Sequence, residues 1–354
     1  MKQRLAAWLL CLACLVAPTL AQAAAFSSIF FFGDSLSDSG NNAIVFAGLG
    51  DPPTPVPIPS NAFIPTQPYA SGHYTNDKVW AQTFAEAFGL SATPSLLPGG
   101  NNFAFGGART GPLTLPPADP AGFPFSLQNQ VLFFLGTHGG VAPGDTLYVI
   151  AGGGNNARDA LAAILGGAPI GPTIAATATG FASDIGTMLT QLEGAGAEHI
   201  VVWTAPDAGK APAVIAAGGS SVGTLVSSAM NDALENLLVG NPGLAEGVQV
   251  FDLFALLQAV TAPGAPFFTN VTDACARFVV SATDLGTCDP TAYLFWDGIH
   301  PTSGGHALIA SGMIALIPEP SVLALLVVAV AAAVLAYRLR APGLSASRRT
   351  RTTR

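Results

Sequence analysis

Residues 28–40 read SIFFFGDSLSDSG. The apolar run at 28–32 predicts a buried strand, and the glycine after it predicts a tight turn. This turn places Ser35 just beyond the carboxyl end of the strand, where open α/β sheets carry their functional residues. Most serines at strand ends are turn or capping residues, so Ser35 indicates chemistry only if it has partners elsewhere in the sequence.

Those partners stand near the other end of the chain, where residues 297–300 read DGIH. Asp297 and His300 supply an acid and a base, and with Ser35 they are the side chains of a serine-hydrolase triad. The chain order Ser, Asp, His excludes the chymotrypsin and subtilisin arrangements. The G-x-S-x-G elbow of the α/β-hydrolases is also absent, because Ser37 stands in place of its second glycine. We therefore expect a different hydrolase scaffold.

Residues 1–25 have the order of parts found in a secretory signal peptide. Lys2 and Arg4 precede a short apolar stretch, and small residues follow it. We expect cleavage after Ala23 or Ala25 and export of the protein. The alternative is an uncleaved anchor, but the apolar stretch is short for a segment that spans a bilayer.

The C-terminal residues 318–354 also have three parts. A Pro-Glu-Pro sequence at 318–320 precedes an uncharged apolar segment at 321–337, and six arginines follow within 338–354. The apolar segment is at the short end of what crosses a bilayer as a transmembrane helix, and the arginines favour a cytoplasmic C-terminus. This tail resembles the PEP-CTERM sorting signal of Gram-negative bacteria. The resemblance implies a periplasm-facing intermediate in the inner membrane, cleavage near 318–320 by an exosortase-type enzyme, and delivery to the cell surface or extracellular matrix.

The remaining residues, 26–317, are the predicted catalytic domain. They hold five basic and twenty acidic residues, a formal charge of −15. Nucleic-acid binding is therefore excluded as a function, because it requires clustered lysine and arginine side chains. Polyanionic substrates are disfavoured for the same reason.

Only Cys275 and Cys288 are left in this domain. In an exported protein such an isolated pair predicts a disulfide. The histidines do not cluster with other ligand types, so we expect no metal site. A glycine run at 152–154 follows a predicted strand, but the lysine of a phosphate-binding loop and the acidic residue of a dinucleotide site are both missing, so we expect no cofactor.

Apolar β-branched runs alternate with segments of helical period, a pattern typical of a mostly parallel sheet with helices on both faces. We predict five strands, at 28–32, 102–105, 146–151, 199–204 and 248–253. Predicted helices include 78–88, 174–192, 222–238 and 303–316. Asn76 is the predicted N-cap of the first of these helices. The fold class is therefore α/β with three layers.

Four segments, each at a predicted strand end or in a late loop, occur in a recognisable order. They are FGDSLSDSGN at 32–41, NFAFGGA at 102–108, GGN at 153–155 and DGIHPT at 297–302. This set is similar to the GDSL, or SGNH, hydrolase family across nearly all of residues 26–317. The resemblance implies a flavodoxin-like αβα fold and ester hydrolysis.

The resemblance also assigns roles. Ser35 matches the nucleophile, and Asp297 and His300 match the other triad members. Gly107 and Asn155 match the oxyanion-hole donors, which act together with the backbone N–H of Ser35. Two positions depart from the family pattern: Asn156 stands in place of an aspartate, and His73, for which we expect a structural role, stands in place of an arginine.

We therefore expect an exported serine esterase or lipase that hydrolyses small-molecule, lipid or glycan acyl esters through an acyl-enzyme. A second enzymatic reading is a deacetylase of acetylated exopolysaccharide. A third reading, from a different class, is a catalytically idle matrix or adhesion protein. The complete set of five matching site residues argues against the third.

Overall fold

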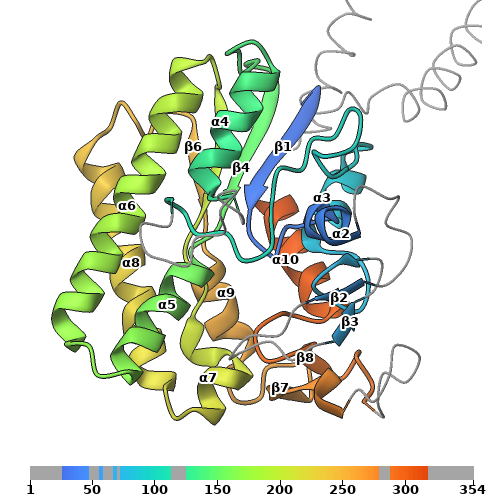
Figure 1. Cartoon of the computed structure of the whole chain (residues 1–354), viewed down its shortest axis with the longest axis vertical. Helices are drawn as coiled ribbons and strands as arrows, with labels where there is room; N and C mark the ends of the chain where they lie inside the picture. The colour runs from blue at the N-terminus through green and yellow to red at the C-terminus, as the bar shows by residue number, and fades with distance from the viewer. Residues whose placement is uncertain are drawn as a thin grey trace, which may run out of the picture. The chain divides into compact units, whose positions relative to one another are not determined.

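A parallel sheet of four strands lies at the centre of the computed structural model (Figure 1). The strands are β1 (Ser28–Gly33), β4 (Thr146–Ala151), β5 (His199–Trp203) and β6 (Val248–Phe251), side by side in that order. The structure describes residues 26–47, 56–58, 67–69, 72–112, 125–278 and 288–317. The predicted signal peptide and sorting tail lie outside these residues, and the part that is described contains no helix long and apolar enough to span a membrane.

The predicted strand at 102–105 is wrong in detail. This segment runs beside the free edge of β1 and exchanges backbone hydrogen bonds with it, from Phe103 N to Phe31 O and from Phe105 N to Gly33 O. It forms only isolated bridges and not a continuous ladder. If residues 102–105 are counted as an edge strand, the order across the sheet is 102–105, β1, β4, β5, β6. Numbered along the chain, this is the flavodoxin order 2-1-3-4-5, in which the strand order reverses between β1 and β4.

Helices cover both faces of the sheet, which confirms the predicted three-layer α/β fold (Figure 1). One face carries α4 (Leu127–Thr137), α5 (Gly154–Leu165), α6 (Ile170–Gly194) and α8 (Ser220–Gly240). The other carries α3 (Trp80–Ala87) and α10 (Ser303–Leu316). Shorter elements are α2 (Asn41–Ala47), α7 (Pro212–Ala216), α9 (Leu253–Val260), the antiparallel pair β2 (Val56–Ile58) and β3 (Gln67–Tyr69), and the parallel pair β7 (Asn270–Ala274) and β8 (Tyr293–Phe295).

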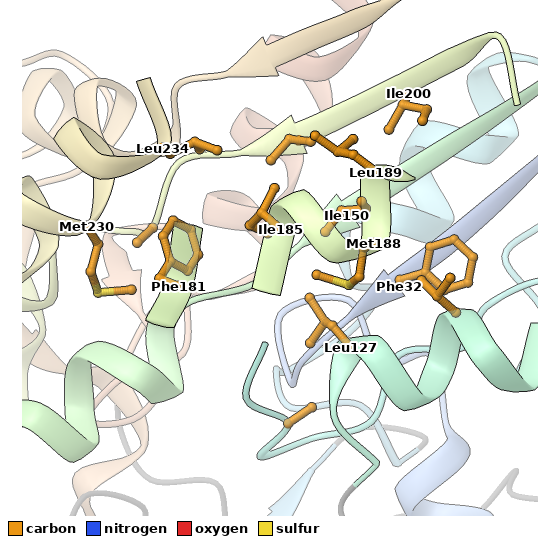
Figure 2. Close-up of a cluster of buried hydrophobic side chains, with 14 of the residues drawn as sticks. Phe32, Leu127, Ile150, Phe181, Ile185, Met188, Leu189, Ile200, Met230 and Leu234 are labelled. Carbon is orange, nitrogen blue, oxygen red and sulfur yellow. The ribbon is translucent and has the colours of Figure 1, made fainter. Parts of the chain in front are cut away.

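Alternate residues of the strands point to opposite faces and fill two layers of core. Phe32, Ile150 and Ile200 pack against α4, α6 and α8, where Phe181 and Met230 are also buried (Figure 2). Both sides of β1 and β4 are buried almost throughout, as expected for a parallel sheet covered on both faces, whereas the edge strand β6 is partly exposed.

The opposite core layer is built around two indoles. Trp80 of α3 and Trp203 of β5 lie with ring centroids 4.5 Å apart, and Phe31 packs edge-on against Trp80 at 5.5 Å. The Trp203 N–H points to the sulfur of Met313 on α10 at 3.2 Å. These contacts fix α3 and α10 on the sheet, and α10 follows directly after the DGIH motif.

The N-cap predicted for α3 is wrong. Asn76 accepts a hydrogen bond from Ser303 N at 2.8 Å and donates one to Ser303 Oγ at 3.0 Å, so it contacts the start of α10 and not of α3. Val79 occupies the N-cap of α3, where its backbone N–H is satisfied by the Gln82 side chain. The polar residue before the helix therefore serves a long-range contact.

Candidate active site

The structure brings Ser35, His300 and Asp297 into one hydrogen-bonded chain. His300 Nε2 lies 2.8 Å from Ser35 Oγ, and His300 Nδ1 lies 2.7 Å from Asp297 Oδ2. Asp297 and His300 are each 1% exposed, and Ser35 is 7% exposed. A carboxylate can only accept, so Nδ1 donates to Asp297 and Nε2 is left to accept the Ser35 hydroxyl proton. This is the arrangement that a serine nucleophile and its base require.

The turn between Asp297 and His300 is fixed by the aspartate itself. Asp297 Oδ1 accepts from the backbone N–H groups of Ile299 at 2.8 Å and His300 at 2.7 Å. Trp296 N also donates to His300 O at 2.7 Å. One oxygen of the carboxylate thus shapes the loop while the other orients the imidazole, which explains why the acid and the base stand three residues apart.

A second tight turn presents Ser35 at the end of β1. Asp34 O accepts from Ser37 N and Asp38 N, each at 3.0 Å, and Asp34 Oδ1 accepts from Leu36 N at 3.0 Å. Burial raises the pKa of the Asp34 carboxyl to about 6, although the Leu36 N–H, His300 and Arg158 act in the opposite direction. Through these hydrogen bonds Asp34 supports the turn that presents Ser35.

Gly33 is required by close packing. A Cβ at this position would lie 2.8 Å from Ala151 O on the neighbouring strand. The peptide groups of Gly33 are bonded by the Gln130 side chain of α4, which accepts from Gly33 N at 2.8 Å and donates to Gly33 O at 2.8 Å. Sequence reasoning missed this residue, because an amide in a helix gives no local sign of such a partner.

Asp38 joins the serine turn to the segment that carries Gly107. Its carboxylate accepts from the backbone N–H groups of Gly40, Asn41 and Asn42, and from Gly106 N at 2.9 Å. Burial raises the pKa of Asp38 to about 6, against these four hydrogen bonds. The Asn42 amide adds a bond to Gly106 O at 3.0 Å. The turn that carries Ser35 and the glycine segment are thus held together by Asp38 and Asn42.

Asn155 lies at the start of α5, directly after β4. Its Nδ2 donates one hydrogen to Ala108 O at 2.8 Å, and the amide nitrogen carries a second hydrogen. Asn155 lines the same cavity as Ser35 and His300. Gly107 has φ +85°, which only glycine adopts readily, and it is bracketed by the bonds to Gly106 and Ala108. Asn155 therefore lies at the cavity of Ser35, and Gly107 lies in the segment that Asn155 and Asp38 hold.

The cavity beside Ser35 has a volume of about 90 Å³. One wall is apolar and includes Pro206, Val214, Leu253, Leu257, Phe295 and Ile309. Arg158 also lines it, three residues after Asn155 on α5, and burial lowers the pKa of its guanidinium. Sequence reasoning did not identify Arg158, although the spacing of three places it on the same helix face as Asn155.

The other two histidines near the site have structural surroundings. The His73 ring nitrogens lie 2.9 Å from Asp77 O and 3.2 Å from Ser39 O, which agrees with the role expected for His73. His306 is fully buried, its Nδ1 accepts from Trp80 N at 3.2 Å, and burial lowers its pKa to about 3. Tyr74 instead contacts the imidazole of His300, with ring centroids 5.1 Å apart.

Cys275 and Cys288 are joined by a disulfide, with Cα atoms 5.4 Å apart. The residue next to Cys275 is tied to the triad loop, because Ala276 N donates to Trp296 O at 2.7 Å. Within the described ranges, no three histidine, cysteine, aspartate or glutamate side chains are grouped so that they could hold a metal ion.

The model of the family described as GDSL-like Lipase/Acylhydrolase matches residues 29–313. The chain is 28% identical over 325 residues to a Pseudomonas putida protein described as an uncharacterized protein in the trpE-trpG intergenic region, a match that covers 85% of this chain and 50% of that protein. It is 32% identical over 148 residues to a GDSL esterase/lipase of Arabidopsis thaliana, covering 36% and 41% of the two chains. The chain thus spans about half the length of these relatives, or less.

Among solved structures, one match is to Est24, described as a carbohydrate acetylesterase from Sinorhizobium meliloti. The TM-score is 0.39 at 15% sequence identity, with 82% of this chain and 99% of that chain covered.

Proposed function

Because the chain belongs to the GDSL-like lipase/acylhydrolase family, we propose that it is an exported serine esterase in which Ser35, His300 and Asp297 hydrolyse carboxylic esters. The observation that carries this proposal is the buried chain of two short hydrogen bonds from Ser35 Oγ through His300 to Asp297. A structural role gives no reason to bury a serine, an imidazole and a carboxylate in this order at the wall of a cavity.

In the proposed reaction, His300 Nε2 takes the Ser35 proton as Oγ attacks the ester carbonyl. Asp297 holds the imidazole in the correct tautomer and stabilises its protonated form. The negative oxygen of the tetrahedral intermediate receives hydrogen bonds from Ser35 N, Gly107 N and Asn155 Nδ2, each worth roughly a hundredfold to a thousandfold in rate. His300 then protonates the leaving alcohol, and water releases the acyl group from Ser35 by the same steps.

The apolar wall supports an acyl chain longer than acetyl as the group that enters the cavity. Each methylene buried there contributes about 0.8 kcal/mol, so two methylenes favour a butyrate ester over an acetate ester by about 15-fold. Val214 lines this wall, and a larger side chain there would occupy the space. Acetylated polysaccharide is the second candidate substrate.

We further propose that the protein is exported by the peptide at 1–25, and that cleavage near 318–320 releases residues 26–317 at the cell surface or in the extracellular matrix. The support for this part is the order of charged and apolar segments at the two ends of the sequence. Mass spectrometry of surface material would contradict cleavage if it recovered peptides from 338–354.

The test of the activity uses p-nitrophenyl acetate, butyrate, octanoate and palmitate, together with an acetylated polysaccharide. We expect turnover in the wild type, none in Ser35→Ala, and wild-type turnover in Ser183→Ala, which changes an exposed serine on α6. Val214→Phe should shift the preference toward acetate. Preference for the polysaccharide would support the deacetylase, and no turnover dependent on Ser35 would leave the non-enzymatic reading.

A further inference from the structure

Asn156, the residue after Asn155, is hydrogen-bonded to both the backbone and the side chain of Thr110. Asn156 Oδ1 accepts from Thr110 N at 3.1 Å, and Asn156 Nδ2 donates to Thr110 Oγ1 at 2.9 Å. The Thr110 hydroxyl in turn donates to Asp184 Oδ2 on α6 at 2.6 Å. Thr110 is fully buried, so its hydroxyl has no water to replace a lost partner.

The direction of this relay is fixed at one end. Asp184 is a carboxylate and can only accept, so it takes the single hydroxyl proton of Thr110. Its other oxygen accepts from Gln128 Nε2 at 3.0 Å. The Thr110 oxygen can therefore only accept from residue 156, which must at the same time accept from Thr110 N. Asparagine meets both demands, whereas an aspartate has no proton to offer Thr110.

We infer that Asn156 and Asp184 are a matched pair that positions the oxyanion-hole segment through Thr110. Asp184 of α6 supplies the carboxylate that accepts the Thr110 proton, and Asn156 of α5 supplies the amide that this direction of the relay needs. The inference rests on the proposed function, because it assigns a positioning role for the proposed hydrolysis.

The pair is well placed for this role. Thr110 closes the segment that holds Gly107 and Ala108, and Asn155 next to Asn156 bonds to Ala108 O at 2.8 Å. Arg109 in the same segment forms a two-pronged ion pair with Asp159 of α5. Two consecutive asparagines of α5 therefore hold the segment, one as the proposed oxyanion donor and the other as its support.

The decisive experiment measures kcat and KM with p-nitrophenyl butyrate for Asn156→Asp, Asp184→Asn and the double variant. In Asn156→Asp a buried bond is lost, so we expect kcat to fall about tenfold with KM within about twofold. Asp184→Asn alone should change kcat by less than about twofold, because its amide oxygen can still accept the Thr110 proton and the partly exposed Gln128 can turn its own amide to accept from the new NH2 group. In the double variant the relay runs in reverse with every group satisfied, so kcat should return to within about threefold of wild type.

Rescue by Asp184→Asn is the readout that a simple loss of stability would not produce. Asp232→Asn is the matched control, because it removes one carboxylate from an exposed position on α8 and should not rescue Asn156→Asp. If Asn156→Asp does not fold alone, Thr110→Val removes the same relay and should lower kcat about tenfold.

Wild-type kcat in Asn156→Asp or in Thr110→Val would overturn the inference, and so would a failed rescue or an equal rescue by the control. A wild type without Ser35-dependent turnover would instead refute the proposed function.

Discussion

Asp297→Asn tests the tautomer control that the structure indicates. In the wild type, Oδ1 accepts from two backbone N–H groups, of Ile299 and His300, and Oδ2 faces His300 Nδ1. An asparagine keeps its oxygen toward the two N–H groups, because its NH2 group would meet two donors there. Its NH2 group then donates to Nδ1, which moves the imidazole proton to Nε2. A protonated Nε2 cannot accept from Ser35.

The size of the effect follows from the cost of the reverse orientation. Turning the amide to restore the correct tautomer leaves the buried His300 N–H and the partly buried Ile299 N–H without an acceptor, at about 1–3 kcal/mol each. The competent state is therefore about 2–6 kcal/mol above the inactive one, which corresponds to a loss in kcat of roughly 30-fold to 10⁴-fold. The upper value is about what loss of tautomer control costs in serine proteases.

The assay is steady-state hydrolysis of p-nitrophenyl butyrate, with the melting temperature measured in parallel. We expect the melting temperature to stay within about 2 °C of wild type, because asparagine has the same shape and keeps both backbone bonds. Asp289→Asn, the same chemical change at an exposed residue a few positions earlier, should leave kcat unchanged. A kcat within tenfold of wild type in Asp297→Asn would refute the tautomer argument.

Three further outcomes are expected. The pKa of Asp34 is about 6 in the folded protein against 3.8 for an ordinary aspartate, so Asp34 contributes stability below pH 4 that is lost as the pH rises through 6. In urea unfolding, the free energy of unfolding of the wild type relative to that of Asp34→Asn should therefore fall by about 3 kcal/mol between pH 4 and pH 6. Parallel pH profiles of the two proteins would contradict this. Replacing Cys275 and Cys288 by serine should cost about 3 kcal/mol and lower the melting temperature by at least about 5 °C, as calorimetry would show. Gly106→Ala places a Cβ 2.3 Å from the Tyr74 ring, which packs against the imidazole of His300. The clash should displace the Tyr74 ring and lower kcat about tenfold or more. Unchanged kinetics would show that the Tyr74 ring can move without disturbing His300.

Local sequence patterns were sufficient to predict three strands of the sheet and helix α10, which follows His300. The apolar runs of β1, β4 and β5 are bounded by polar or glycine residues, and a parallel sheet buries both faces of such runs. The bounds of α10 were predicted correctly, since Thr302 caps its first turn by accepting from Gly305 N. In each case the signal and the structure lie within a few residues of one another.

Contacts between distant residues could not be predicted in this way. Asn76 was expected to cap the helix that follows it, but its partner Ser303 is 227 positions away in the sequence. Gln130 contacts Gly33 across 97 positions. An amide side chain can donate and accept in any direction, so its type alone does not reveal which backbone groups it satisfies.

The wrong strand at 102–105 and the predicted oxyanion glycine have one physical cause. A strand that continued past Phe105 would keep φ near −120°, whereas Gly107 has φ +85°. The segment must therefore leave the sheet before it reaches Gly107, and side chains take over the bonds that a ladder would supply. The Asn41 amide donates to Asn102 O and Ala104 O, each at 2.8 Å, and the Asn102 amide donates to Ser37 O at 2.7 Å. The backbone must therefore be irregular, and held by buried amide side chains, for the Gly107 N–H to face the proposed reaction centre. Substitutions at Asn41 and Asn102 should accordingly disturb both the site and the edge of the sheet.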